Sequence, residues 1–287
     1  MTTVPAQVAG VPEIAIVTSP SYQGSIHPAI LAVCCELGIT EVYRISGVQA
    51  VAALALGTDT IPKVDKIVGP SSIWAQLAKK ELFGLVDIDS FAGPSDVLII
   101  ADQTARPDWL AADLLSQAEH APGSAVLLTD NAKLAEAVAL ELDRQLSHLT
   151  RSEQTRVCVQ ESCLAVVTRD LSEAITLANE FAPEHLQIQC ADNPAVAEKI
   201  TNAGAIFLGP YTPVAVGDYY AGPSHTLPVG GSARIFGPLN VNDFLKQSSI
   251  ISYNQPALTA ATDAIDTIAK AEGLDAHANS VKIRLKK

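Results

Sequence analysis

The sequence predicts an α/β fold with two Rossmann-like layers of parallel strands, followed by a short helical tail. Short apolar runs typical of buried parallel strands alternate with stretches of helical period, which is the pattern of successive βαβ units. Only 5% of the residues are aromatic, while small and branched aliphatic residues dominate. With 287 residues, 48% of them hydrophobic, the chain is long enough to bury such layers.

The first layer is expected over residues 1–92 and is predicted to be doubly wound. Its predicted strands are 14–17, 41–45 and 66–68, and its predicted helices are 28–37, 49–56 and 73–82. Loops at the carboxyl ends of such strands are where open α/β sheets bind ligands. A nucleotide site is therefore allowed there, although no GxGxxG fingerprint occurs. A Gly/Pro loop over 87–95 predicts the domain boundary.

The second domain is expected over residues 93–245. Its predicted strands are 96–101, 125–129, 164–168, 186–189 and 205–208, and its predicted helices begin at Pro107, Ala132 and Leu171. The first of these helices should stop at Ala121-Pro122-Gly123. Residues 209–228 form the longest irregular segment, and such loops are usually functional. A tail over 246–287, with a helix at 256–271, is too short to bury its own core, so it should dock on the body or on a second subunit.

Charge and cysteine content narrow the class of protein. A net charge of -12 argues against nucleic acid as a partner and favours small molecules. No stretch approaches the length of a membrane span. Five cysteines without a disulfide-like framework, Cys34, Cys35, Cys158, Cys163 and Cys190, indicate a reducing compartment. We therefore expect a cytoplasmic protein that contacts neither nucleic acid nor membrane.

Two stretches carry candidate chemistry. Asp113, Gln117 and His120 share one helix face, where an amide oxygen and an imidazole could bind a divalent cation; a histidine that caps the helix end is the alternative. Glu184 and His185 are adjacent on a predicted loop and suit proton transfer, since histidine titrates near neutral pH and a buried glutamate can accept a proton. Two solvated loop residues are the alternative there.

Other polar side chains with useful chemistry lie downstream. Asp218 and His225 fall in the long irregular segment, and Glu272 and His277 fall in the tail. Several longer motifs occur along the chain in one order. These are Phe91–Ser95, Asp113–His120, Pro183–Leu186, Gly217–Tyr219, Ala221-Gly222, His225–Pro228, Ala233-Arg234, Glu272–Leu274, His277-Ala278 and Ser280-Val281. In this order they closely resemble the histidinol dehydrogenase family, NAD-dependent enzymes that take L-histidinol through an aldehyde to L-histidine.

The resemblance implies a site and its cofactors. One Zn²⁺ per subunit would be held by Gln117, His120, Asp218 and, from the partner of a homodimer, His277. Glu184 would activate the attacking water and His185 would shuttle protons. The positions that match substrate contacts are Ser95, Gln117, His120, His185, Asp218, His225, Glu272 and His277. Gln49 and Ser72 match cofactor positions.

The chain departs from the family pattern in three places. It begins well over a hundred residues into the family's sequence, so we expect an N-terminally shortened member with the second layer incomplete. Gly69-Pro70-Ser71-Ser72 replaces Gly-Pro-Gly-Asn, and Asp96 replaces a glutamate. The alternative to an active enzyme is a catalytically inactive zinc-binding fragment or homologue without a complete NAD site.

Overall fold

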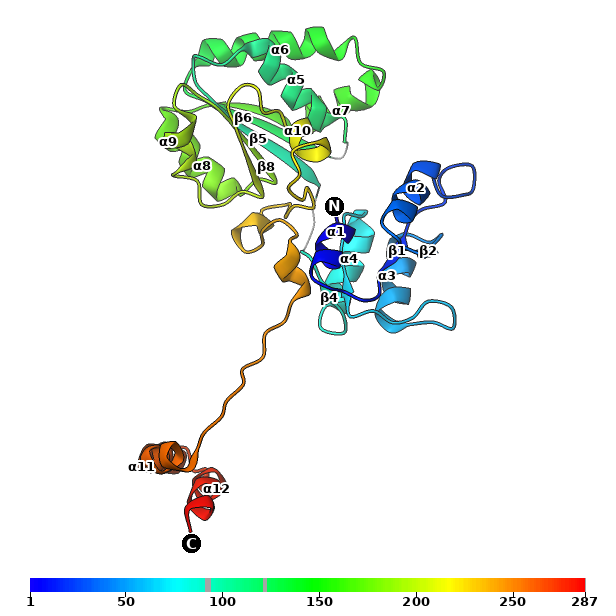
Figure 1. Ribbon diagram of the computed structural model, residues 1–287. Helices are drawn as coiled ribbons and strands as arrows, with labels where there is room; N and C mark the ends of the chain where they lie inside the picture. Colours follow the sequence, from blue (N-terminus) through cyan, green and yellow to red (C-terminus); the bar gives the residue numbers. More distant parts are fainter. Residues whose placement is uncertain (91–93, 121–122, 287) are drawn as a thin grey trace. The chain divides into compact units, whose positions relative to one another are not determined.

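The computed structural model describes residues 1–90, 94–120 and 123–286 (Figure 1). The chain divides into two compact units, Met1–Leu245 and Lys246–Lys287, and each is described by itself. The predicted domain boundary at 92/93 and the predicted helix stop at Ala121-Pro122 lie outside the described residues, as does most of the motif that begins at Phe91.

The first layer of the first unit contains two small parallel sheets instead of the single doubly wound sheet that we predicted. Its elements are α1 (Thr3–Val8), β1 (Ala15–Val17), α2 (Pro28–Glu36), β2 (Glu41–Tyr43), α3 (Gly47–Leu56), β3 (Lys66–Ile67), α4 (Ile73–Leu82) and β4 (Asp87–Ile88). β1 pairs with β2, and β3 pairs with β4. These strands are two or three residues long, but one apolar cluster, which includes Val51, Ile67 and Ala75 with Val17 and Tyr43 packed against it, joins both sheets.

The second layer is a five-stranded parallel sheet in the order β7-β6-β5-β8-β9. Its strands are β5 (Ser95–Ala101), β6 (Gly123–Thr129), β7 (Cys163–Val167), β8 (His185–Gln189) and β9 (Ala205–Leu208). Its helices are α5 (Pro107–Ala118), α6 (Ala132–Leu146), α7 (Ser152–Ser162), α8 (Leu171–Phe181), α9 (Asn193–Ala197) and α10 (Val214–Tyr219), and the short helical turns η1 (Ser232–Arg234) and η2 (Val241–Phe244) follow. The predicted α/β fold with parallel sheets is confirmed. The long segment that we expected to be irregular contains α10, and α7 and α9 were not predicted.

The core lies on both faces of β5, and Figure 1 shows α5 and α6 over one face of the sheet and α8 and α9 over the other. Alternate residues of a strand point to opposite faces. Val97 and Ile99 accordingly pack with α5 and α6, while Leu98 and Ile100 pack with α8. Each such buried aliphatic side chain stabilises the fold by roughly 2 kcal/mol. The polar residues at the start of β5 and β8 are thus carried by strands that are buried on both faces.

The second unit contains α11 (Gln255–Ala271) and α12 (Asp275–Leu285), which pack against each other. Asp266 accepts from Lys270 at 2.7 Å and pairs with Lys282 at 2.6 Å, which ties the two helices together. Among the described residues, no helix combines the length and the apolar character needed to cross a membrane.

Candidate active site

The site is built at the amino ends of two neighbouring strands. β5 and β8 pair in parallel with Val97 opposite His185, which brings the residues just before this register together. The Ser95 hydroxyl donates a 2.5 Å hydrogen bond to Glu184 Oε2. The Asp96 N–H donates to the same oxygen at 3.1 Å, and the Glu184 N–H donates to Asp96 Oδ1 at 2.7 Å. Strand register therefore holds the Glu184 carboxylate in a defined position.

Our sequence-based placement of Glu184 and His185 on a loop is wrong for His185, which begins β8. The alternative of two solvated residues is also wrong, because only 8% of Glu184 and 5% of His185 is exposed. The reason lies in the sheet: β8 has a neighbour on each side, and the Glu184 carbonyl accepts from the Ala205 N–H at 2.9 Å. A Cβ at Gly204 would lie 2.6 Å from that carbonyl oxygen, so the close approach requires glycine.

His185 is held as a neutral imidazole with one nitrogen available. Its Nδ1 lies 2.9 Å from the Asp96 carbonyl oxygen, and since a carbonyl can only accept, Nδ1 must carry the proton. In the neutral imidazole Nε2 is then the unprotonated nitrogen, and it lies 3.9 Å from Asp218 Oδ1. Burial lowers the pKa of His185, opposed by its contact with Asp96 and by the nearby Asp218 charge. This arrangement leaves Nε2 free to accept a proton.

Burial has the opposite effect on the neighbouring carboxyl groups, because it disfavours the charged form. It raises the pKa of Glu184 to about 7, although the hydrogen bonds from Ser95 and the Asp96 N–H oppose the shift. The charge of Asp218 raises this pKa further, and His120 lowers it. Burial also raises the pKa of Asp96 to about 6. Glu184 is therefore poised to gain and lose a proton near neutral pH.

Asp218 reaches the site on α10, and the approach of this helix depends on a glycine. A Cβ at Gly217 would lie 2.6 Å from the Phe207 ring, which belongs to β9. The absence of a side chain lets α10 pack closely on β9. The Phe207 ring in turn lies 6.0 Å from the His185 ring, centroid to centroid. The short apolar start of α10, which buries Val214, gives only a weak signal for a helix in the sequence.

Gln117 lies in the last turn of α5 and His120 lies beyond the end of that helix. The side chain of Gln117 is buried, and its Nε2 has no hydrogen-bond partner among the described residues, whereas His120 is exposed. The predicted shared helix face with Asp113 is wrong for His120, because α5 ends at Ala118 and the chain turns. Asp113 instead accepts hydrogen bonds of 2.9 Å from both Gln187 and Gln189 of β8.

The remaining predicted residues are not joined to this cluster by any described contact. His225 is half-buried, and its Nδ1 has no partner in the described part of the chain. Glu272 and His277 belong to the second unit, at the junction of α11 and α12.

The predicted cofactor residues, Gln49 and Ser72, lie in the first layer at the starts of α3 and α4, and both are exposed. Ser72 caps α4 by accepting from the Ala75 N–H at 3.5 Å, so its hydroxyl hydrogen is available. A buried ion pair fixes the turn before it: Lys79 Nζ donates to Asp89 Oδ1 at 2.5 Å and to the Gly69 carbonyl at 3.0 Å. The exposed amide and hydroxyl fit a polar ligand such as a dinucleotide.

The donor chemistry also fits a mixed-ligand cation. Gln117 offers an amide oxygen, His120 an imidazole and Asp218 a carboxylate, which are N and O donors of the kind that a divalent cation accepts. No cluster of three or more His, Cys, Asp or Glu that could hold a metal occurs among residues 1–90, 94–120 and 123–286. A complete shell built on these three donors would therefore need a further ligand from elsewhere.

Part of the site was not predicted from the sequence. Asp96 was identified only as a departure from the family pattern, yet it hydrogen bonds with Glu184 through both its backbone and its side chain. Gln187 and Gln189 were not identified as candidates. Their spacing was the available signal: in His185-Leu-Gln-Ile-Gln every second residue is polar, which places His185 and both glutamines on one face of the strand.

Fold and geometry together define an α/β protein with a buried acid–base pair beside side chains suited to a metal ion. Comparison with known proteins is consistent with this class. The family model for histidinol dehydrogenase matches residues 1–285. Histidinol dehydrogenase from Heliobacterium mobile is 50% identical over 288 residues, which is 100% of this chain and 67% of the relative. The Rhodopirellula baltica enzyme is 51% identical over 99% of this chain and 62% of the relative.

A solved structure agrees with these relatives. The crystal structure of histidinol dehydrogenase from Elizabethkingia anophelis superposes with a TM-score of 0.93 at 37% identity, over 99% of this chain and 66% of that chain. The chain thus spans about two thirds of the length of these proteins. It belongs to the histidinol dehydrogenase family, oxidoreductases of histidine biosynthesis that generally depend on NAD and zinc. The alternative of an inactive homologue is not favoured by these matches.

Proposed function

We propose that this chain carries out the NAD-dependent oxidation of L-histidinol, through histidinal, to L-histidine. The observation that carries the proposal is the buried pair Glu184 and His185, held at the start of β8 with Ser95 and Asp218 around it. Each of the two oxidations removes a hydride and a proton, and a water molecule enters between them. The reaction therefore needs one group that takes protons from hydroxyls and another that activates water.

His185 takes the first role in this proposal. Its Nε2, unprotonated and facing Asp218, accepts the proton of the alcohol in the first oxidation and that of the aldehyde hydrate in the second. The nearby Asp218 carboxylate stabilises the imidazolium formed each time. The Asp96 carbonyl fixes the tautomer, so that the accepting nitrogen always faces the substrate side.

Glu184 takes the second role. With a pKa raised to about 7 by burial, its carboxylate accepts a proton from water as the oxygen adds to the aldehyde carbon. The Ser95 hydroxyl and the Asp96 N–H, which both donate to Oε2, orient the carboxylate. This binding also leaves Oε1 as the oxygen that faces the water.

Two cofactors complete the proposal. Gln117, His120 and Asp218 would hold Zn²⁺ together with His277 of the partner subunit in a homodimer, and the ion would anchor the substrate as a Lewis acid. Gln49 and Ser72 would bind NAD, which accepts a hydride in each oxidation. Ser95, His225 and Glu272 would contact the substrate. Free cysteines throughout the described chain support a reducing, cytoplasmic location.

The test is NADH production by the purified chain with L-histidinol and NAD, with zinc supplied and again after chelation. Turnover that depends on zinc is expected. If bound zinc is confirmed and no NADH forms at saturating NAD, the proposal is contradicted and the chain is a zinc-binding member without this activity.

A further inference from the structure

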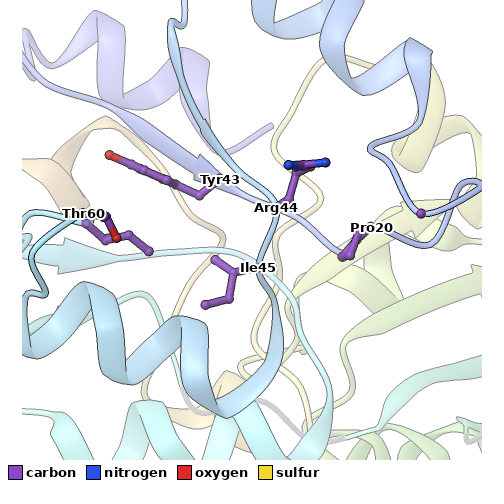
Figure 2. A pocket seen from close by; sticks show the side chains of 7 residues that line it. Pro20, Tyr43, Arg44, Ile45 and Thr60 are labelled. Carbon is purple, nitrogen blue, oxygen red and sulfur yellow. The ribbon is translucent and has the colours of Figure 1, made fainter.

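A cavity of about 370 Å³ borders the acid–base pair, and Asp96 and Gly230 are among the residues that line it. The cavity of about 400 Å³ in Figure 2 is instead lined by residues of the first layer, such as Tyr43 and Arg44. Asp96 hydrogen bonds with Glu184. The smaller cavity therefore brings a residue that contacts the pair next to the segment that follows the proposed substrate contact His225.

Asp96 contacts the pair through its backbone and, separately, through its side chain. Its N–H donates to Glu184 Oε2 and its carbonyl meets His185 Nδ1, and any residue other than proline at this position would supply both contacts. The side chain adds an acceptor: Oδ1 receives the Glu184 N–H at 2.7 Å. The carboxylate also accepts from the N–H of Gly230, a contact that opposes the rise of its pKa. Only 3% of Asp96 is exposed, so this buried carboxylate joins the start of β8 to the segment around Gly230.

The same segment packs against Glu184 at a second point. A Cβ at Gly204 would lie 2.6 Å from the Glu184 carbonyl oxygen and 3.3 Å from both Cδ and the carbonyl oxygen of Pro228. Pro228 and the Glu184 carbonyl therefore both lie close to Gly204. Residues 226–229 are all buried, and His225 directly precedes them. The position of His225 thus depends on how residues 226–230 are held against the backbone of Glu184.

We propose that Asp96 is a positioning residue, whose carboxylate holds residues 226–230 against the backbone of Glu184. The inference rests on the proposed function and deepens it. It assigns the spacing between the proposed substrate contact His225 and the water-activating Glu184 to a side chain that takes no part in proton transfer itself.

Steady-state kinetics of the full chain with L-histidinol, NAD and zinc test the proposal. Asp96→Asn keeps the size of the side chain but has one acceptor oxygen in place of two. We expect its kcat/KM to fall about tenfold, as loss of one charge-assisted contact would. Most of the loss should be in kcat, because the position of Glu184 matters in the transition state.

Two further variants accompany this measurement. Asp96→Glu keeps both acceptor oxygens, and the cavity beside it has room for the extra methylene, so kcat/KM should stay within about threefold of the parent. Exposed Asp143→Asn is the matched control, and its kcat/KM should stay within about twofold.

Stability separates a positioning role from a structural one. Burial disfavours the charged form of Asp96 and raises its pKa to about 6, so at about pH 8 Asp96→Asn should unfold at the parent's urea concentration or a higher one. Loss of kcat without loss of stability, restored by Asp96→Glu, is the expected pattern. Loss of both together, with no recovery in Asp96→Glu, would assign Asp96 a structural role and overturn the proposal.

Hydrogen exchange followed by mass spectrometry tests the contact without turnover. In Asp96→Asn, a peptide that contains Glu184 or Gly230 should exchange faster than in the parent, whereas Asp143→Asn should show parent rates. Unchanged exchange in both peptides, or parent-level kcat/KM, would reject the positioning role alone. Faster exchange in a chain that shows no turnover would reject the proposed function and keep the contact.

Discussion

The two layers of the first unit use their polar side chains in opposite ways. In the five-stranded sheet, Glu184 and His185 are buried and hydrogen bond to the start of β5. In the first layer, the proposed cofactor residues Gln49 and Ser72 are exposed, and α4 leaves 69% of Trp74 open to solvent. Proton transfer by a carboxyl group benefits from desolvation, because burial raises the pKa of that group toward neutrality. A ligand as large as a dinucleotide instead needs open donors that it can reach.

The largest effect should come from the buried pair. Glu184→Gln removes the proton acceptor and keeps the size, so turnover should fall about 10²- to 10⁴-fold. The turnover of His185→Asn should fall by a similar factor. The zinc content of both variants should stay at the parent level. Steady-state NADH formation and metal analysis measure this, with exposed Glu180→Gln as the control. Parent-level turnover in either variant would remove the corresponding role.

In the first layer a buried ion pair between Lys79 and Asp89 serves structure instead. Only 2% of the Lys79 side chain and 6% of that of Asp89 is exposed, and removal of one partner from such a pair costs about 3–5 kcal/mol. Lys79→Met should therefore lower the free energy of unfolding in urea by this amount and weaken NAD binding, since the pair holds the turn at Gly69. Exposed Lys80→Met is the control.

The double variant Lys79→Met/Asp89→Leu sharpens this prediction, because replacement of both charges by apolar groups avoids an unpaired buried ion. It should recover most of the lost stability. If Lys79→Met unfolds at the same urea concentration as Lys80→Met, the ion pair does not anchor this layer.

The same contrast explains what could be predicted from the sequence. Strands of the five-stranded sheet are apolar and bounded by clear breakers, so the strand 205–208 was predicted with its observed bounds, and 96–101 and 186–189 were predicted within one residue of theirs. The first layer has strands of two or three residues, and their division into two sheets depends on long-range packing that no local pattern encodes. Likewise, the burial of Glu184 depends on the register between β5 and β8. The close packing of α10 on β9 depends on the absence of a side chain at Gly217, next to the Phe207 ring. Neither contact is visible in the local sequence.

The buried carboxyl groups should make stability fall as pH rises, which is the reverse of the usual behaviour of paired carboxylates. Burial raises the pKa of Asp96 from 3.8 to about 6. Between these values the folded chain holds a proton that the unfolded chain has released, so the free energy of unfolding decreases with pH and levels off above about 6. The full change is roughly 3 kcal/mol.

Urea unfolding of metal-free chain at a series of pH values tests this. Glu184, with its pKa raised to about 7, adds a decrease that continues to that pH. Asp96→Asn should remove the decrease in unfolding free energy that Asp96 causes and leave the decrease that Glu184 causes. Exposed Asp143→Asn should show the same pH dependence as the parent. Burial lowers the pKa of His185, which adds a change of the opposite sign, so the profiles are compared by difference. Identical pH profiles for the parent and Asp96→Asn would contradict the raised pKa of Asp96.

A smaller effect should come from the contact between α5 and β8. Asp113 Oδ2 accepts from Gln187 and Gln189 at 2.9 Å each, and burial raises the pKa of this carboxyl. Asp113→Ala would leave two buried amide N–H donors unpaired, at a cost of about 2 kcal/mol in unfolding free energy. Asp113→Asn should cost less because its oxygen still accepts, and Asp143→Ala should have almost no effect.

Because α5 carries Gln117 and β8 carries His185, Asp113→Ala should also lower kcat more than a loss of folded protein explains. Equal specific activity per folded molecule would limit Asp113 to stability and leave the position of the acid–base pair to strand register alone.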